Sequence, residues 1–260
     1  MIRNYLLITF RNMLRNKVFL IINILGMGIA VACCIVAYLN NEFSSSFDQH
    51  HVNGETIYRV QAWHVYQGNR NRHAQTPTPL GNLLRENVNQ IDEVVRYTTA
   101  NNQYRIGDEI FNASVAYSDS AFFDLFNFEL ISGSFNALKD KSRVLISNEL
   151  ALKYFDTEEV AGRPLTQVIN GEPKEFIIGG VFKVQPLNSS FGFDAITLWD
   201  NYWHSSNEKA AAEISWKSMN TLFVQIKNPA EVSSVVKSLQ KYIEPQNKAQ
   251  EDLQFSEYYL

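Results

Sequence analysis

The sequence contains almost no cysteine. Its only two cysteines, Cys33 and Cys34, are adjacent and lie inside an apolar run, where they behave as small apolar side chains and cannot readily form a structural disulfide. The rest of the chain must therefore be stabilised by its hydrophobic core alone. About 220 residues are ample to bury one such core, or two small ones.

Acidic residues are absent from the first 41 positions. This segment contains four basic residues, so its formal charge is +4, and these residues are Arg3, Arg11, Arg15 and Lys17. The remaining residues hold the other 19 Lys and Arg and all 27 Asp and Glu, a formal charge of −8. A nucleic-acid partner requires cations clustered on the folded part of a protein, so we expect no such partner.

Recognisable catalytic motifs are also missing. The sequence has no phosphate-binding loop, no G-x-S-x-G and no H-E-x-x-H motif, so we predict no catalytic residue, no cofactor and no ATPase activity in this chain. The best metal candidate is Asp48-Gln49-His50-His51, with His64, His73 and His204 elsewhere. Adjacent residues seldom ligate one ion well, so we interpret this segment as a polar turn and predict no metal site.

One long apolar run is present, at residues 18–39. It holds 22 residues with a single amide, Asn23, and no charge, and as a helix it would span about 33 Å, the thickness of a bilayer core. A cleavable signal peptide would have a shorter run and a small-x-small cleavage site, so we predict a retained transmembrane helix. Because the basic residues precede the run and the acidic residues follow it, the N-terminus is expected in the cytoplasm.

Small residues recur at i, i+4 spacing within this run, as Gly26 with Ala30 and Gly28 with Ala32. Such pairs let a second membrane helix approach closely, and we identify them as a candidate helix-packing face. The ordinary composition of membrane helices explains them equally well.

The residues before the run predict an amphipathic helix at residues 1–17. Apolar side chains recur there every three or four residues, while the arginines lie mostly on the opposite side. We expect this helix to lie in the cytoplasmic membrane interface, contacting lipid through Arg3, Arg11, Arg15 and Lys17. The alternative is a simple basic flank.

From residue 40 onward, strand-like and helical segments alternate without a regular βαβ rhythm, which favours an α+β fold made of two small subdomains. Strands are expected at 93–99, 103–107 and 110–117, with Gly107-Asp108 as a hairpin turn, and another strand pair should flank Asn170-Gly171. Asp119 is expected to cap a short helix, and residues 67–73 to form an exposed basic loop.

Together these segments resemble the N-terminal part of the bacterial permeases of the MacB and FtsX superfamily, whose outer part is the MacB-like periplasmic core domain. The resemblance covers nearly the whole chain, and its order and spacing carry more weight than any single motif. It rests on residues 10–17, 23–26, 42, 47–48, Ile57-Tyr58-Arg59-Val60, 76–80, 122–133, 150–155, Ile178-Gly179-Gly180-Val181-Phe182 and 186–193. Asp156 departs from the glycine usual at that position.

The resemblance implies a transmembrane and periplasmic subunit of an ABC transporter in the bacterial inner membrane, acting by mechanotransmission. Its partners would be a cytosolic ABC ATPase, a second permease copy or paralogue, membrane lipid and a periplasmic adaptor or other envelope protein. The periplasmic domain, residues 40–260, would divide into a porter-like part (45–105 and 210–260) and a sabre-like part (106–209). In that family further spans follow, so this chain would be the N-terminal portion of a permease.

Two other classes of function are compatible with the sequence. A single-pass receptor or interaction module would bind a periplasmic ligand or partner without ATP dependence. A membrane-anchored enzyme acting through His50 and His51 is the least favoured class, because no nucleophile, base or metal set accompanies those histidines.

Overall fold

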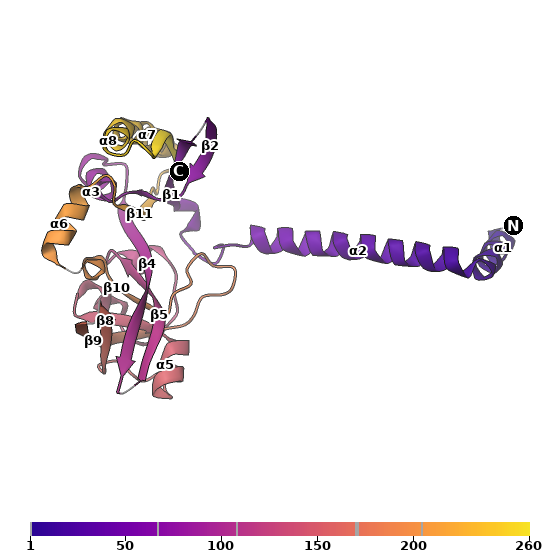
Figure 1. The fold of residues 1–260 in the computed structure, drawn as a ribbon, viewed down its shortest axis with the longest axis horizontal. Helices are drawn as coiled ribbons and strands as arrows, with labels where there is room; N and C mark the ends of the chain where they lie inside the picture. The colour runs from indigo at the N-terminus through magenta and orange to yellow at the C-terminus, as the bar shows by residue number, and fades with distance from the viewer. Residues whose placement is uncertain (1, 67, 108, 170–171, 204) are drawn as a thin grey trace. The chain divides into compact units, whose positions relative to one another are not determined.

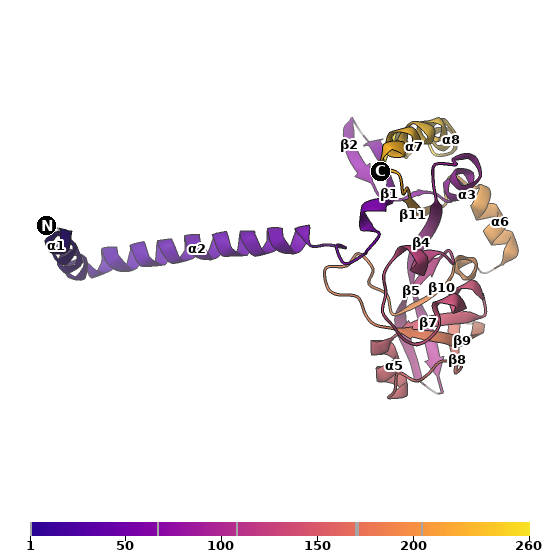
Figure 2. The same cartoon turned by 180° about the vertical axis from the view of Figure 1, so that it is seen from behind.

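The computed structural model describes residues 2–66, 68–107, 109–169, 172–203 and 205–260. The chain forms two compact units, Met1–Asp48 and Gln49–Leu260. Figures 1 and 2 show the elements of each unit from two sides.

The first unit contains two helices, α1 (Ile2–Arg15) and α2 (Lys17–Ser45), separated at Asn16. α1 covers most of the segment 1–17 in which a helix was expected, but Asn16 interrupts the helix and Lys17 belongs to α2. By length and composition α2 meets the requirements of a membrane span, and a signal sequence near the N-terminus meets them too. α2 begins one residue before the predicted run and continues beyond it, because residues 40–45 contain neither proline nor glycine.

The second unit is a mixed α+β domain, as expected. Its strands are β1 (Ile57–Tyr66), β2 (Asn69–His73), β3 (Thr76–Pro77), β4 (Glu93–Ile106), β5 (Glu109–Ser118), β6 (Leu130–Gly133), β7 (Arg143–Ser147), β8 (Pro164–Ile169), β9 (Glu172–Phe182), β10 (Ala195–Leu198), β11 (Met219–Gln225) and β12 (Gln254–Tyr259). Its helices are α3 (Thr78–Asn87), α4 (Phe122–Leu125), α5 (Asn148–Phe155), α6 (Ser206–Ile214), α7 (Val232–Leu239) and α8 (Ile243–Ala249). Short 3₁₀ turns are η1 (Gly54–Thr56), η2 (Phe135–Lys139), η3 (Trp199–Tyr202), η4 (Pro229–Glu231) and η5 (Gln240–Tyr242).

The described strands form one 12-stranded sheet in the order β12-β1-β11-β4-β5-β10-β7-β9-β6. β8 pairs with both β4 and β9, so β4, β5, β10, β7, β9 and β8 close into a ring. Two neighbour pairs in the ring, β5 with β10 and β7 with β9, are parallel, and the others are antiparallel. The long strand β4 is shared between two parts of the sheet: it is a member of the ring, and it also pairs with β11, which continues to β1 and β12 (Figure 1 shows β4, β11 and β1).

Alternation along the strands places apolar side chains in separate clusters. One cluster is built mainly from the ring, including Tyr104, Phe111, Val115 and Ile146. A second joins β1, β11 and β12 to α3 and α7. A third cluster is rich in phenylalanine, and its fully or largely buried aromatic members are Phe122, Phe126, Phe182, Phe191 and Phe193.

Close packing explains why two positions in and beside the segment Ile178-Gly179-Gly180-Val181-Phe182 are occupied by glycine. Gly133 has φ +78°, and a Cβ there would overlap the backbone of Gly179. A Cβ at Gly179 would overlap the Cβ of Ala137. β6 can therefore lie against β9, and η2 against the same strand, only where side chains are absent.

Several local predictions were wrong. The two strands expected at 93–99 and 103–107 are one continuous strand, β4, because pairing with β5 runs unbroken from Tyr97 to Ile106. Residues 69–73 of the expected basic loop form β2, a hairpin partner of β1. Strands flank both predicted turns, but Asp108, Asn170 and Gly171 lie outside the described residues.

The expected cap on α4 is also absent, because α4 has no side-chain cap. The carboxylate of Asp119 instead accepts hydrogen bonds from the backbone N–H and the guanidinium of Arg96. A buried arginine binds a carboxylate more strongly than the neutral N–H of a four-residue helix does.

Candidate functional site

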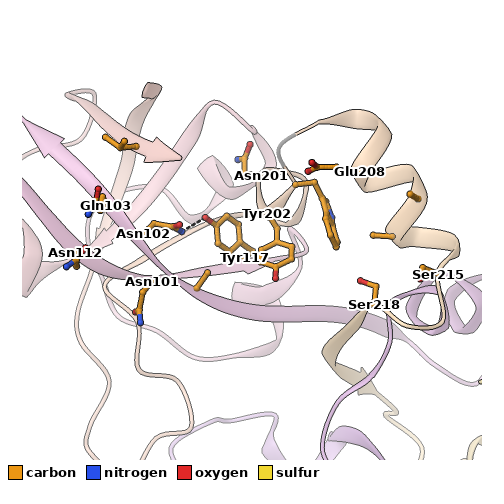
Figure 3. A pocket seen from close by; sticks show the side chains of 15 residues that line it. Asn101, Asn102, Gln103, Asn112, Tyr117, Asn201, Tyr202, Glu208, Ser215 and Ser218 are labelled. Carbon is orange, nitrogen blue, oxygen red and sulfur yellow. Dashed lines mark hydrogen bonds between the residues drawn. The ribbon is translucent and has the colours of Figure 1, made fainter. Parts of the chain in front are cut away.

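A pocket of about 990 Å³ is lined by α6, by η3, by residues 100–103 of β4 and by Asn112 and Tyr117 of β5. Five of its lining side chains are amides, Asn101, Asn102, Gln103, Asn112 and Asn201. Figure 3 shows Asn101, Asn102, Gln103 and Asn112 on the strand side, opposite Glu208 and Ser215 on the α6 side. Of the lining residues that the structure describes, Glu208 alone carries a formal charge near neutral pH.

Aromatic rings form another part of the wall. Tyr117, Tyr202 and Trp203 line the pocket, and the rings of Tyr117 and Tyr202 meet edge to face with centroids 5.3 Å apart. Such a wall offers apolar faces beside the amide groups, a combination typical of small-ligand sites.

The hydroxyl of Tyr117 is held in place by two amides. Asn102 Nδ2 donates to it at 2.6 Å and the fully buried Gln167 Nε2 at 2.9 Å (Figure 3 shows the first). Burial raises the pKa of Tyr117, against the opposing effect of these two hydrogen bonds. The phenol therefore stays protonated and fixes Asn102 at the pocket wall.

An ion-pair network anchors α6 beside the pocket. Arg96 on β4 is buried, pairs with Asp119 at 2.6 Å and with Glu213 of α6 at 3.3 Å, and lies 4.9 Å over the ring of Trp199. Burial lowers the pKa of Arg96, but the hydrogen bonds and charges of Asp119 and Glu213 outweigh it, so the pKa is raised overall. The guanidinium stays charged and ties the α6 wall to the strands.

The residues predicted to act in the membrane lie in the other unit. Arg11, Arg15 and Lys17 are exposed, and the side chain of Arg3 is not among those described. Gly26, Gly28, Ala30 and Ala32 are exposed on α2, and nothing lies within 4 Å of a Cβ built at either glycine. Their roles stay predictions.

The histidine segment is not assembled as a metal site in the described part of the chain, where no three His, Cys, Asp or Glu side chains are grouped to hold an ion. His51 packs against Phe126 and Phe191, and its Nδ1 accepts from the N–H of Asn127 at 3.1 Å. His51 is thus part of the packing of the domain. His204 lies outside the described residues.

The basic segment around β2 is also engaged within the domain. Arg70 pairs with Glu257 of β12, and its guanidinium lies 4.4 Å from the ring centroid of Trp63. Arg72 lies 5.5 Å from the same ring. Both arginines therefore contact aromatic or acidic side chains of their own domain.

Sequence reasoning missed the pocket because its walls come from distant segments, residues 100–103, 112–117, 168 and 201–218. The run Ala100-Asn101-Asn102-Gln103 was the available signal. Three consecutive amides within a strand are unusual, because asparagine is depleted in strands.

The structure combines one apolar helix, which could be a membrane span or a signal sequence, with a mixed-sheet α+β domain. The sequence profile of the MacB-like periplasmic core domain matches residues 20–242. The chain belongs to this family, which forms the periplasmic domain of MacB- and FtsX-type ABC transporter permeases. Domains of this kind are normally non-catalytic. No curated protein matches the chain.

Three solved structures have the same fold. A domain of a protein described as a permease from Porphyromonas gingivalis has a TM-score of 0.66 at 20% identity, over 81% of this chain and 90% of that one. The periplasmic region of MacB from Actinobacillus actinomycetemcomitans gives 0.54 at 15%, over 78% and 89%. The extracellular domain of the noncanonical ABC-type transporter YknZ from Gram-positive bacteria gives 0.52 at 15%, over 77% and 99%.

Proposed function

We propose that this chain is the N-terminal transmembrane and periplasmic portion of an ABC transporter permease that works by mechanotransmission. A cytosolic ATPase would dimerise on ATP, and the membrane helices would transmit that motion to the periplasmic domain to export or extract a substrate. The observation that carries the proposal is a family match that begins inside α2 and continues through the domain, to residue 242.

The length of α2 supports a mechanical role. Its 29 residues correspond to about 43 Å of helix, and the apolar run ends at Leu39, so the helix continues unbroken for six residues beyond the run to Ser45. A continuous hydrogen-bonded helix transmits a displacement from one end to the other, whereas a flexible linker would absorb it.

The described chemistry of the domain also suits this role. The most buried cation, Arg96, is paired with two carboxylates, and the pocket wall consists mainly of amides, hydroxyls and aromatic rings. None of these groups is a nucleophile activated by a neighbouring base. The ATPase would lie in a partner subunit.

We further propose the inner-membrane arrangement that the charge pattern predicts. α1 would lie in the cytoplasmic interface through Arg3, Arg11, Arg15 and Lys17. The small-residue face of α2, with Gly26, Gly28, Ala30 and Ala32, would pack against another helix of the permease or of a second copy.

The division of the domain into a porter-like part (45–105 and 210–260) and a sabre-like part (106–209) also stays a proposal. It is supported by the core clusters, since every fully buried member of the β1–β11–β12 cluster falls in the first part. The ring cluster spans residues 104–199 and falls almost entirely in the second.

Two experiments test the proposal. The first isolates the native complex through an affinity tag on the permease and identifies its subunits. The second inserts four residues after Ser45 and measures transport. Insertion of Gly-Ser-Gly-Ser should uncouple transport while the ATPase stays bound, whereas the matched helical insertion Ala-Glu-Ala-Ala should retain more transport. A native complex without an ATPase or a second permease chain would refute the proposal. Equal transport with both insertions would refute the role of a rigid α2.

The amide- and aromatic-lined pocket favours a second candidate, a single-pass receptor that binds a periplasmic ligand or partner. The two functions differ in their dependence on nucleotide. Periplasmic crosslinks in native membranes should change when ATP is depleted if the chain is a permease, and they should stay constant if it is a receptor.

A further inference from the structure

An interruption in strand pairing lies at the floor of the pocket. On one edge of β4, pairing with β11 ends at Tyr97 and pairing with β8 begins at Gln103. β11 and β8 both run antiparallel to β4 along this edge, and a break separates the end of one pairing from the start of the other. Across residues 98–102, no described strand pairs with that edge, although β5 pairs with the opposite edge throughout.

Asn101 directs its backbone hydrogen-bonding groups into this break. It lies opposite Ser114 of β5, and Ser114 uses its own backbone groups elsewhere: its C=O accepts from Asp194 N at 2.8 Å and its N–H donates to Asp194 Oδ2 at 2.7 Å. Ser114 and Asn101 thus form a non-hydrogen-bonded pair of the antiparallel ladder. In such a pair the backbone N–H and C=O groups of both residues point away from the partner strand. The N–H and C=O of Asn101 therefore face the open edge.

The pocket opens onto the same break. Its lining includes residues 100–103 of β4, Val168 at the end of β8 and Ser218 immediately before β11. Val168 and Ser218 thus lie at the two ends of the interruption. Tyr202 and Trp203 contribute apolar surface to the lining, and α6 contributes Glu208, Ala211 and Ala212 (Figure 3 labels Tyr202 and Glu208).

We propose that this pocket binds a short extended polypeptide segment, which pairs with Asn101 of β4 and fills the break between β8 and β11. Exposed strand edges are templates for such pairing, in which main-chain hydrogen bonds supply affinity and pockets select alternate side chains. Asn102, Gln103 and Asn112 carry both donors and acceptors and match the amide groups of a peptide. Because Glu208 is the one charged group on the described wall, the segment is largely uncharged.

The proposal differs from transport itself. It assigns a ligand class and a site, and it holds whether the chain is a permease or a receptor. An oligosaccharide is the competing occupant, since amides and aromatic rings also bind sugars, but a sugar does not require the backbone groups of Asn101.

The experiment uses the full chain in detergent micelles. An array of acetylated, amidated pentapeptides built from Ser, Thr, Val, Tyr, Asn and Gly is screened for binding, with chitotriose and cellotriose as competing probes. The strongest peptide is then N-methylated at one position at a time. Strand pairing predicts that methylation at alternate positions weakens binding at least about tenfold, while the intervening positions change it little.

Two substitutions of Asn101 separate the contribution of its backbone N–H to peptide binding from that of its side chain. Asn101→Ala keeps the N–H and should weaken binding only about two- to threefold, whereas Asn101→Pro removes the N–H and should weaken it at least about tenfold. Proline is tolerated where the N–H faces away from the partner strand. Thermal unfolding of both variants checks the fold. Ala211→Trp, which fills the pocket from the exposed side of α6, should also abolish binding.

Three results would overturn the proposal. The first is the absence of any pentapeptide binding at millimolar concentration. The second is peptide binding that is equal in Asn101→Pro and Asn101→Ala and shows no alternating effect of N-methylation. The third is binding of an oligosaccharide, blocked by Ala211→Trp, without binding of peptide.

Discussion

Arg96 and Asp119 form a buried ion pair between the first part of β4 and the residue that follows β5. Nη2 of Arg96 lies 2.6 Å from Oδ1 of Asp119, and Nε lies 3.0 Å from Oδ2. The side chains are only 7% and 15% exposed. Because Arg96 also holds Glu213 and Trp199, this pair connects the sheet to both α6 and η3.

Removal of this carboxylate should destabilise the domain strongly. Asp119→Ala leaves a buried guanidinium with one remaining, partly exposed partner, and we expect the free energy of unfolding to fall by about 3–5 kcal/mol. Urea unfolding of residues 49–260 measures the change, since this unit contains all three buried clusters. Glu244→Ala breaks an exposed pair with Lys248 and should have no measurable effect. Equal effects of the two substitutions would contradict the network.

A methyl group added at Gly179 should be tolerated only if a neighbour is removed. Gly179→Ala brings its Cβ into overlap with that of Ala137, and such overpacking costs about 1–3 kcal/mol. The double variant Gly179→Ala with Ala137→Gly should recover part of the loss, which thermal unfolding of all four members of the cycle would measure. Strictly additive effects would show that the Gly179–Ala137 contact is not the cause.

Stability should fall at mildly acidic pH because of His73. Burial lowers the pKa of His73, and the neighbouring His64 lowers it further. The unfolded chain then takes up the proton first as the pH falls, so stability declines below the ordinary histidine value of about 6.5 until the lowered native pKa is passed. His73→Gln should reduce the difference between urea midpoints at about pH 7.5 and about pH 5. An unchanged difference would exclude His73 as its source.

Charge in α1 should control membrane topology. Arg11→Glu with Arg15→Glu removes attraction to anionic lipid of roughly 1 kcal/mol per charge and lowers the formal charge that precedes the apolar run from +4 to 0 (two basic residues against two acidic ones). We expect part of the population to place its N-terminus outside, as detected by labelling of a single N-terminal cysteine in a Cys33→Ala, Cys34→Ala background. Arg11→Lys with Arg15→Lys keeps the charge and should keep the topology. A fixed topology in the glutamate variant would refute this role.

Local patterns predicted many elements well. The strands beside Gly107 and Gly171 follow from strand and turn preferences within a few positions. Asp156 is a related case: it has φ +57° at the C-terminal end of α5. This left-handed conformation explains why glycine suits that position.

Predictions failed where a distant residue competed with a local preference. Asp119 has the local features of a helix cap, but Arg96, which lies 23 positions earlier, binds its carboxylate instead. The arginines at 70 and 72 suggested a solvated loop, yet Trp63 and Glu257 hold them on a strand. The polar run at 100–102 suggested a break in a strand, and pairing with β5 prevents one.

The sequence by itself determined the apolar helix, the charge asymmetry around it and the α+β class, because these depend on composition and on periodicity along neighbouring residues. Only the tertiary structure decided that six strands close into a ring, that pairing along β4 is interrupted at residues 98–102, and that residues of α6 line the pocket at this break. Strand pairing and pocket walls join residues more than a hundred positions apart, and the free energy of those contacts comes from partners that no local window contains.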